Sequence, residues 1–417
     1  MDCGSSGLRL AVVDRGGLVQ AEAASPYPRP FVDPEGWRLG LITLAAGLDP
    51  GLRAGVGAIA IAGTSGTLML CRNDGSTFPG TLGLALAYSQ ACQEQAAKAA
   101  ALTADPWESP ASSASGSLAR ALQLLDAVSE AGLHQTELLL RHQADWLLGW
   151  LLGHWRWGEE GNNLRLGWKL EEQRWAGAIG SQPWAAALPE IAPSGAVLGT
   201  LGAAAASALG LPERCLVVAG STDANAAVLA AEPGEGDGIA VLGTTLVLKQ
   251  FCPQPIHGPG ISCHRVGGRW LVGGASNAGA GVLRRFFTDA QLEELSRQID
   301  PRHPSGLELR PLPARGERFP VDDPGLEPVL GPRPVSDSLY LQGLLEGLAA
   351  IEAAGWRRLG QLGAPPLRRV ISLGGGSRNP QWRTIRQRLL GVPVLNRPRL
   401  TGAQGMARLA AGALPLP

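Results

Sequence analysis

Residues 2–14 have the sequence DCGSSGLRLAVVD, in which the carboxylate of Asp2 is followed by a small Gly/Ser turn and then by an alternating apolar segment. The alternation predicts a β-strand over 8–14, and the RGG that follows predicts a hairpin to a second strand beginning with LVQAEA. Backbone amides in a Gly/Ser turn converge and form a site for an anion such as a phosphate. A plain hairpin turn without a ligand is the alternative that the spacing leaves open.

A second stretch repeats this plan in the other half of the chain. The sequence IAVLGTTLVLKQF at 239–251 predicts a strand, a turn made of Gly243, Thr244 and Thr245, and another strand. Two such turns, one from each half, would hold a polyphosphate from both sides. The sequence GGGSRNPQW at 374–382 lies between a predicted strand and a predicted helix, which suits an anion or nucleotide at a helix N-terminus. The chain has no Gly-Lys dipeptide, which excludes a Walker A loop.

Two acidic residues occupy the most suggestive positions. CLVVAG at 215–220 predicts a buried strand, and STDANAAVLAA at 221–231 predicts a helix that Ser221 or Thr222 caps. Asp223 therefore lies in the first turn of a helix, where a carboxylate can accept a proton from an alcohol. Asp2 lies beside the first turn, where a carboxylate can hold Mg²⁺ through water. The structural alternatives are an acid that favours a helix start and an unordered terminal residue, respectively.

Composition limits the class of protein. The 36 basic and 36 acidic residues balance and form no basic stripe, which argues against a nucleic-acid partner. The six cysteines are scattered without a CxxC pair, as expected of reduced thiols. No signal peptide is visible, and the Ala/Gly-rich run at 194–211 predicts a buried helix in preference to a membrane span. We therefore expect a cytoplasmic protein without a membrane partner, for which a monomer is plausible.

The remaining segments give a coarse outline. Apolar spacing predicts one or two amphipathic helices between 117 and 157, and a polar loop leading into a Trp-bearing helix at 161–175. The flexible segment at 232–238 predicts a domain boundary. A Pro-rich irregular segment follows at 301–334, and helices are predicted at 338–359 and 401–414.

Two other sites are weaker. A zinc site would use Cys252, His257, Cys263 and His264, but their spacing fits no standard finger. A hydrolase would use Ser276 in GASNA, a loose nucleophile elbow without Asp and His partners in the usual order.

The motifs, taken in order, resemble those of the FGGY carbohydrate kinases. DCGSSG resembles the first phosphate hairpin of that family, the segment ending in GSTD resembles its catalytic Gly-x-x-Asp, GTTLVLK its second hairpin, and GGGSRNPQW its adenosine-binding turn. Within the family the chain is most similar to the D-ribulose kinase branch, once called xylulose-kinase-like. That likeness rests on GTSGT, SQAC, HQADWL, RWLVGGASNAG, PLPARGERFP and LQGLLEGL.

The resemblance implies an α/β fold of two domains, the actin-like ATPase (ribonuclease H-like) sugar kinase fold with an interdomain active-site cleft. The sugar and the first phosphate hairpin would belong to a domain formed by residues 1–231 and 401–417. The nucleotide would bind a domain formed by residues 232–400.

The resemblance also implies roles for individual residues. Asp223 matches the base that deprotonates the sugar hydroxyl, and it also contacts the sugar. Asp2 matches the carboxylate associated with metal, phosphate and substrate, and Ser65 matches a sugar-contacting serine. Ser5 stands where the family usually has Thr and keeps the hydroxyl, so it is grouped with the catalytic residues. The residues matched to ATP binding are Ser5, Ser6, Gly7, Gly243, Thr244, Thr245, Gly274, Gly374, Gly375, Gly376 and Asn379.

The implied activity is the phosphorylation of D-ribulose to D-ribulose 5-phosphate by ATP with Mg²⁺. Xylulose and glycerol kinases carry a Gln/Met/His-bearing stretch where this chain has SGTLML, and Asp-x-Arg where it has YSQAC, which makes those substrates less expected. The alternatives are a kinase for another ketose or polyol, such as D-xylulose, and a non-catalytic sugar- or nucleotide-binding homologue. Family members have further apolar residues ahead of the first Asp. We therefore expect the natural chain to start upstream of Met1, and Asp2 to lie at a frayed end in this chain.

Overall fold

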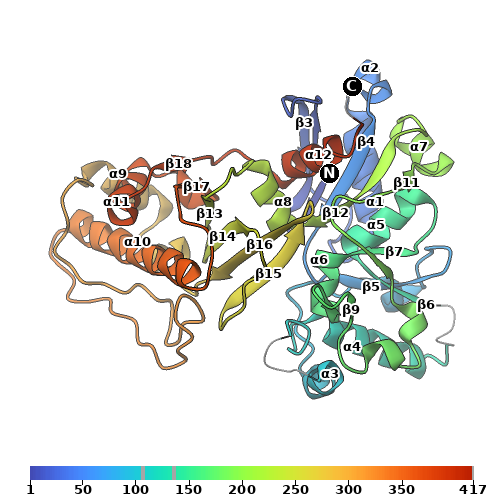
Figure 1. Ribbon diagram of the computed structural model, residues 1–417, viewed down its shortest axis with the longest axis horizontal. Helices are drawn as coiled ribbons and strands as arrows, with labels where there is room; N and C mark the ends of the chain where they lie inside the picture. The colour runs from blue at the N-terminus through green and yellow to red at the C-terminus, as the bar shows by residue number, and fades with distance from the viewer. Residues whose placement is uncertain (105–108, 134–137, 416–417) are drawn as a thin grey trace. The chain divides into compact units, whose positions relative to one another are not determined.

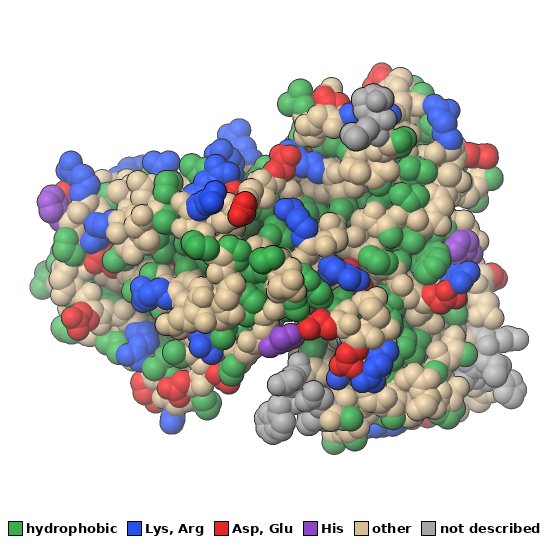
Figure 2. Space-filling model, in the orientation of Figure 1, with side chains coloured by type: hydrophobic (Ala, Val, Ile, Leu, Met, Phe, Trp, Pro, Cys, Tyr) green, Lys and Arg blue, Asp and Glu red, His purple; other side chains and the backbone are tan. Residues whose placement is uncertain are grey.

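The computed structural model describes residues 1–104, 109–133 and 138–415. The chain divides into two compact units. The first comprises Met1–Ala230, Arg265–Gly268 and Thr401–Pro417, and the second comprises Ala231–His264 and Arg269–Leu400. Basic and acidic side chains are interspersed over the visible face of each unit (Figure 2), in keeping with the balanced charge. Among the described helices, none combines the length and apolar character that a bilayer crossing requires.

The first unit is built on a six-stranded sheet in the order β11-β12-β4-β1-β2-β3 (Figure 1). β1 pairs parallel with β4, and β4 pairs parallel with β12, whereas the β1–β2, β2–β3 and β11–β12 pairs are antiparallel. The strands are β1 (Asp2–Gly4), β2 (Gly7–Val13), β3 (Val19–Ser25), β4 (Ala58–Gly63), β11 (Val197–Thr200) and β12 (Leu216–Thr222).

Three two-stranded sheets and nine α-helices complete the described part of this unit. The paired strands are β5 (Leu68–Arg72) with β6 (Leu138–His142), β7 (Trp157–Glu159) with β10 (Glu190–Ala192), and β8 (Trp168–Lys169) with β9 (Arg174–Trp175). The helices are α1 (Pro34–Ala46), α2 (Pro50–Ala54), α3 (Ala96–Thr103), α4 (Ser117–Glu130), α5 (Gln143–Leu152), α6 (Glu160–Asn163), α7 (Ala203–Leu209), α8 (Asp223–Ala230) and α12 (Gly402–Ala411).

Alternation along β4 explains how the sheet is covered on both faces. Ile59 and Ile61 point into a large core that α1, α5 and α7 complete. Ala60 and Ala62 point to the opposite face, where α8 and α12 pack. The small side chains on that face allow close approach, and a Cβ atom at Gly405 of α12 would lie 1.9 Å from the carbonyl oxygen of Ala226. α8 is therefore held firmly at the end of β12.

The second unit contains another six-stranded sheet, in the order β15-β16-β14-β13-β17-β18. α10 packs against α9, α11 and β14. The elements are β13 (Asp237–Leu242), β14 (Leu246–Cys252), β15 (Ile261–Val266), β16 (Arg269–Ala275), β17 (Arg369–Leu373), β18 (Val394–Asn396), α9 (Asp289–Gln298), α10 (Asp337–Gln361) and α11 (Pro380–Leu390). A buried ion pair joins α10 to α11, with 2.5 Å between Nε of Arg386 and Oε2 of Glu352.

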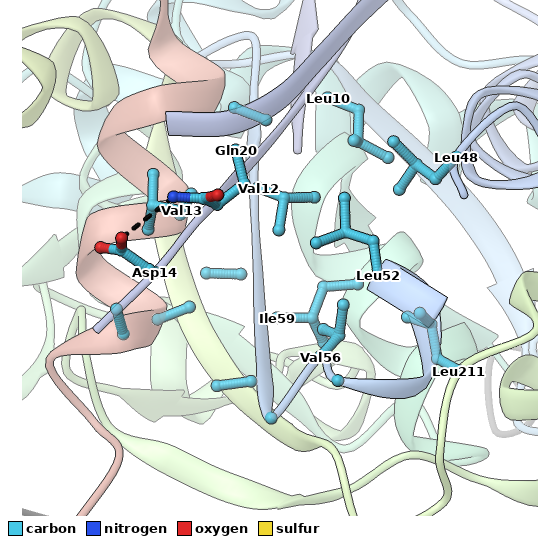
Figure 3. Close-up of a pocket in the computed structure, with 18 of the residues that line it drawn as sticks. Leu10, Val12, Val13, Asp14, Gln20, Leu48, Leu52, Val56, Ile59 and Leu211 are labelled. Carbon is cyan, nitrogen blue, oxygen red and sulfur yellow. Dashed lines mark hydrogen bonds between the residues drawn. The ribbon is translucent and has the colours of Figure 1, made fainter. Parts of the chain in front are cut away.

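β1 is short but paired on both sides. The Met1 ammonium donates to the carbonyl oxygen of Ala60 at 2.8 Å, and the amide of Ala62 donates to the carbonyl oxygen of Met1 at 3.0 Å. A cavity of about 480 Å³ lies next to Met1, along Leu10–Val13 of β2 and Ala58–Ala60 of β4 (Figure 3). The expectation that Asp2 is frayed is wrong, because Asp2 pairs with both neighbouring strands and is 5% exposed.

Three local predictions are corrected by the structure. The segment at 138–142, assigned to a helix from its apolar spacing, is β6, because it forms a ladder with β5. Part of the helix prediction, 134–137, lies outside the described residues. The predicted Trp-bearing helix is instead the β8–β9 hairpin, in which Trp168 and Trp175 pack edge to face. The single helix expected at 194–211 is divided into β11 and α7.

Candidate functional site

Asp2 lies in the middle of the first sheet. Its Oδ2 is 3.8 Å from Nη1 of Arg9, and Oδ1 is buried without a hydrogen-bond partner among the described residues. Burial raises the pKa of this carboxyl, and the neighbouring terminal ammonium and Arg9 oppose the rise. Glycine at residue 402 leaves room for this carboxylate, since a Cβ atom there would lie 2.8 Å from Oδ2. The orphaned oxygen is therefore available to a ligand.

The turn after Asp2 has the geometry of a tight hairpin. Gly4 is paired with Gly7, and Ser5 and Ser6 between them are exposed. Gly7 has φ +151°, and a Cβ atom there would lie 2.7 Å from the carbonyl oxygen of Ser25. Only glycine fits this position without strain, and the two serines at the tip of the turn are exposed, as an anion site requires.

Asp223 begins α8, directly after the buried strand β12. The Thr222 hydroxyl accepts the Asn225 amide at 3.3 Å, which fixes the helix start. The Asp223 carboxylate accepts the Ala224 amide at 2.8 Å and is also hydrogen-bonded by the backbone of Ser65. Burial, followed by the charge of Asp2, raises the pKa of Asp223 to about 6. The structure thus brings together Asp2, Ser65 and Asp223, which lie far apart in the sequence.

Gln143 holds the turn that carries Ser65. Its Oε1 accepts from the Thr64 amide at 3.0 Å and from the Thr64 hydroxyl at 2.9 Å. Its Nε2 donates to the Tyr27 hydroxyl at 3.3 Å, and that hydroxyl donates to the Gly4 carbonyl oxygen at 2.8 Å. One buried amide therefore links the Ser65 turn to the end of β1.

Sequence reasoning did not assign Gln143, Tyr27 or Arg165, a third residue near this turn, to the site. Gln143 lies in HQADWL, a motif quoted only for family likeness, so its position next to Thr64 carried no signal. Tyr27 and Arg165 have no local pattern that marks them, since their relation to the site arises from folding.

The remaining candidates lie in the second unit. Gly243, Thr244 and Thr245 form the turn between β13 and β14, with Thr244 exposed. Its backbone is anchored, because the Ala280 amide donates to the Gly243 carbonyl oxygen at 2.9 Å. Gly274, in β16, is buried under Phe319, whose ring would lie 2.4 Å from a Cβ atom there, so packing accounts for this glycine.

The GGGSRNPQW turn follows β17. Gly374 has φ +80°, a backbone conformation that favours glycine. A Cβ atom added at Gly375 would meet no other atom within 4 Å. Gly375 and Gly376 belong to a short 3₁₀ helix, Gly375–Arg378. Asn379 caps α11, since its Oδ1 accepts the Trp382 amide at 2.9 Å. The segment forms a strand, turn and helix in the order that the sequence predicted, with the turn glycines at the helix start.

The residues present fit Mg²⁺ of the kind that arrives with a nucleotide. Among the described residues no group of three or more His, Cys, Asp or Glu side chains could hold a metal. Mg²⁺ commonly keeps several waters and uses one or two carboxylates together with substrate phosphates, however. Asp2, with an orphaned buried oxygen and a neighbouring carboxylate in Asp223, meets that requirement.

Ser276, the nucleophile that the hydrolase alternative requires, is buried and hydrogen-bonded within the protein. Ser276 is buried at 1% exposure, and its hydroxyl donates to Oε2 of Glu317 at 2.5 Å. The same hydroxyl accepts the Ala278 amide at 2.9 Å. Ser276 therefore stabilises a turn, and its hydroxyl is not accessible to a substrate.

Comparison with known proteins identifies the fold and the family of the C-terminal part. Residues 238–414 match the FGGY family of carbohydrate kinases, C-terminal domain. A "xyloylose kinase" from Brucella ovis is 19% identical, covers 99% of this chain and is itself covered over 89%, with a TM-score of 0.82. A xylulose kinase from Rhodospirillum rubrum is 22% identical, with 99% of this chain and 89% of that chain covered and a TM-score of 0.79. A Plasmodium falciparum glycerol kinase with ADP is 14% identical, with 99% of this chain and 88% of that chain covered and a TM-score of 0.78. Residues 238–414 thus correspond to an FGGY carbohydrate kinase C-terminal domain, and the whole chain has the two-domain α/β fold of sugar kinases.

Proposed function

We propose that this protein is a carbohydrate kinase that phosphorylates D-ribulose with ATP, with Asp223 as general base. The observation that carries the proposal is the Asp223 carboxylate at the start of α8. It is fixed by two backbone hydrogen bonds, has a pKa raised to about 6, and lies near Asp2. A base with a pKa just below neutrality is ionised at pH 7 and still accepts a proton effectively.

In the proposed reaction, the sugar hydroxyl oxygen forms a bond to the γ-phosphorus of ATP. The bond from the γ-phosphorus to the β,γ-bridging oxygen breaks, ADP leaves, and the hydroxyl proton passes to Asp223. Phosphoryl transfer asks the protein mainly for alignment and charge stabilisation. Mg²⁺ at Asp2 would neutralise phosphate charge, and the amides and hydroxyls of Ser5 and Ser6 would bind phosphate oxygens.

The second unit is proposed to bind the nucleotide. The match of 238–414 to an FGGY carbohydrate kinase C-terminal domain supports this assignment. The turn around Thr244 and the glycines at 374–376 offer backbone amides for phosphate and adenosine. Asn379 supports that turn as the cap of α11.

A kinase for D-xylulose is the second candidate, because solved proteins of the same fold are named xylulose kinases. Against it, the chain has SGTLML and YSQAC where the resemblance leads us to expect the substrate-contacting residues of that branch. A binding protein without catalysis is less favoured, because Asp223 keeps the position and the raised pKa of a base.

The test measures ADP release with Mg-ATP in the presence of D-ribulose, D-xylulose, L-ribulose, gluconate or glycerol. We expect release that depends on D-ribulose, with kcat/KM at least about tenfold above the other compounds, the discrimination that one or two contacts supply. In Asp223→Ala the rate should fall about 100-fold or more. Asp14→Asn, at the exposed β2–β3 turn, serves as control and should keep the rate. Sugar-independent release, or none from folded protein, would contradict the proposal.

A further inference from the structure

Arg165 is directed by its backbone toward the turn that carries Ser65. It is the middle residue of a 3₁₀ helix, Leu164–Leu166, whose last residue is fully buried in the core. The helix ends at Gly167, with φ +108°, whose amide donates to the carbonyl oxygens of Asn163 and Leu164 at 3.1 Å. Cδ of Arg165 lies 3.7 Å from the position that a Cβ atom would take at Gly66.

A second arginine, Arg120, approaches the same glycine, but its guanidinium is already hydrogen-bonded within the protein. Nη1 of Arg120 lies 3.2 Å from that Cβ position. Its guanidinium donates to four backbone carbonyl oxygens, those of Gly66, Ala87, Tyr88 and Ser115. Burial, followed by the positive charge of Arg165, lowers the pKa of Arg120 to about 10. Arg120 therefore has a structural role in fixing the turn.

Arg165 differs from Arg120 because its guanidinium has no hydrogen-bond or ion-pair partner within the described part of the chain. Arg165 is half-buried, and burial lowers its pKa. Its positive charge also lowers the pKa of Arg120, so the two guanidinium groups repel each other. A partly desolvated guanidinium beside a like charge is unfavourable unless an electron-rich group compensates it. Such uncompensated groups are typical of positions where a ligand completes the interaction.

The place of Arg165 identifies that ligand. Gly66 follows Ser65, whose backbone is hydrogen-bonded to the Asp223 carboxylate. Consecutive Cα atoms are about 3.8 Å apart, so Arg165, whose Cδ lies beside Gly66, and Asp223, which contacts Ser65, approach neighbouring residues of one short turn. A guanidinium presents parallel N–H donors that match two adjacent oxygen atoms. An open-chain ketose offers such a pair in its carbonyl and a neighbouring hydroxyl.

We propose that Arg165 binds the substrate by donating hydrogen bonds to the carbonyl and a neighbouring hydroxyl of an open-chain ketose, whose terminal hydroxyl faces Asp223. This inference rests on the proposed function and extends it to a residue that selects ketoses over alditols. An alditol lacks the carbonyl acceptor, so it forms a weaker interaction with the fork of donors.

The experiment compares Arg165→Met, Arg165→Lys and the control Arg174→Met with wild type. Met keeps the length of the apolar stem, and Arg174 is an exposed arginine of the neighbouring hairpin. In Arg165→Met we expect the KM for D-ribulose to rise about 10- to 100-fold, the effect of losing hydrogen bonds to a charged group. The KM for ATP should stay unchanged and kcat should change only a few-fold. Lys should restore part of the loss, and Arg174→Met should behave as wild type.

Two further measurements separate substrate binding from a structural role. The melting temperature of Arg165→Met without sugar should equal or exceed that of wild type, because the substitution removes an uncompensated charge. The preference of wild type for D-ribulose over ribitol, measured by calorimetric binding without ATP, should disappear in Arg165→Met. A lowered melting temperature with an unchanged KM for D-ribulose would show a structural residue and overturn the inference.

The outcomes also distinguish this inference from the proposed function. An active wild type whose sugar KM is insensitive to Arg165→Met overturns the role of Arg165 and leaves the kinase intact. A wild type that binds D-ribulose through Arg165 but releases no ADP overturns the kinase and supports Arg165. A wild type that binds no sugar overturns both.

Discussion

The substitution Asp223→Asn is expected to stabilise the protein while abolishing most of its activity. In the wild type the Ala224 amide donates to Oδ1 of Asp223 at 2.8 Å. Asn keeps the shape of the side chain and an oxygen that can accept this hydrogen bond, but it carries no charge. Burial and the charge of Asp2 raise the pKa of Asp223 from 3.8 to about 6. That difference corresponds to roughly 3 kcal/mol for a fully desolvated group. Since Asp223 retains some solvent contact, we expect a gain of about 1–3 kcal/mol at pH 7.5.

The gain has a defined pH dependence. Well below pH 3.8 the carboxyl is protonated in both the folded and the unfolded state, and the two proteins should be equally stable; at pH 4 the difference in their unfolding free energies should still be well under about 1 kcal/mol. Between 3.8 and about 6 the unfolded chain ionises while the folded chain keeps its proton, so the wild type loses stability as the pH rises. Above about pH 6 the carboxyl is ionised in both states, so the difference in unfolding free energy between variant and wild type reaches its maximum and no longer changes with pH.

The assay combines urea unfolding at pH 4 and pH 7.5 with sugar-dependent ADP release. At pH 7.5 the variant should have the larger unfolding free energy and melt a few degrees higher, while its rate falls about 100-fold or more. Asp322→Asn, which changes an exposed carboxylate of the second unit, should alter neither quantity. A variant that is less stable than wild type at pH 7.5, or that keeps its rate, would refute the assignment of Asp223 as a base whose charged form is disfavoured by partial burial and by Asp2.

Three further predictions follow from other contacts. The kcat/KM of wild type should rise about tenfold per pH unit up to about pH 6 and then level off, because Asp223 must be ionised to act as a base. In Asp2→Asn the rising part of this pH profile should move to lower pH, because the negative charge that raises the pKa of Asp223 is gone. An unchanged profile would exclude electrostatic coupling of the two carboxyls. Gln143→Leu leaves a buried backbone amide without its acceptor, so unfolding free energy should fall by about 1–3 kcal/mol and kcat should drop; unchanged thermal melting would contradict the network. Glu352→Gln should lower the unfolding free energy of the second unit by about 3–5 kcal/mol, because Arg386 loses its charged partner in the core; urea unfolding measures this, and a shift below 1 kcal/mol, roughly the worth of an exposed pair, would refute it.

Local structure followed from the sequence where short-range signals were strong. The hairpin of β2 and β3 and the turn at Gly243 were predicted from alternation and from Gly/Ser/Thr turn chemistry. The start of α8 at Asp223 was predicted from a buried strand followed by capping residues. These features depend on neighbours within about ten residues, which is the range over which local propensity acts. The overall two-domain α/β fold was also predicted correctly, from the resemblance of the ordered motifs to those of the FGGY carbohydrate kinases.

Tertiary structure decided what local pattern could not. The segment 138–142 has apolar spacing compatible with a helix, and it is a strand because β5 offers it a partner. The raised pKa of Asp223 depends on burial and then on the charge of Asp2, and the backbone of Ser65 also contacts the carboxylate; Asp2 and Ser65 are separated from Asp223 by long stretches of chain. Arg165 carried no sequence signal, because its lack of a partner and its position beside Gly66 exist only once η4 (Leu164–Leu166) and the turn after β4 have come together. The sequence alone thus determined which residue types and turns are present, whereas folding determined their mutual distances, their burial and therefore their charge states.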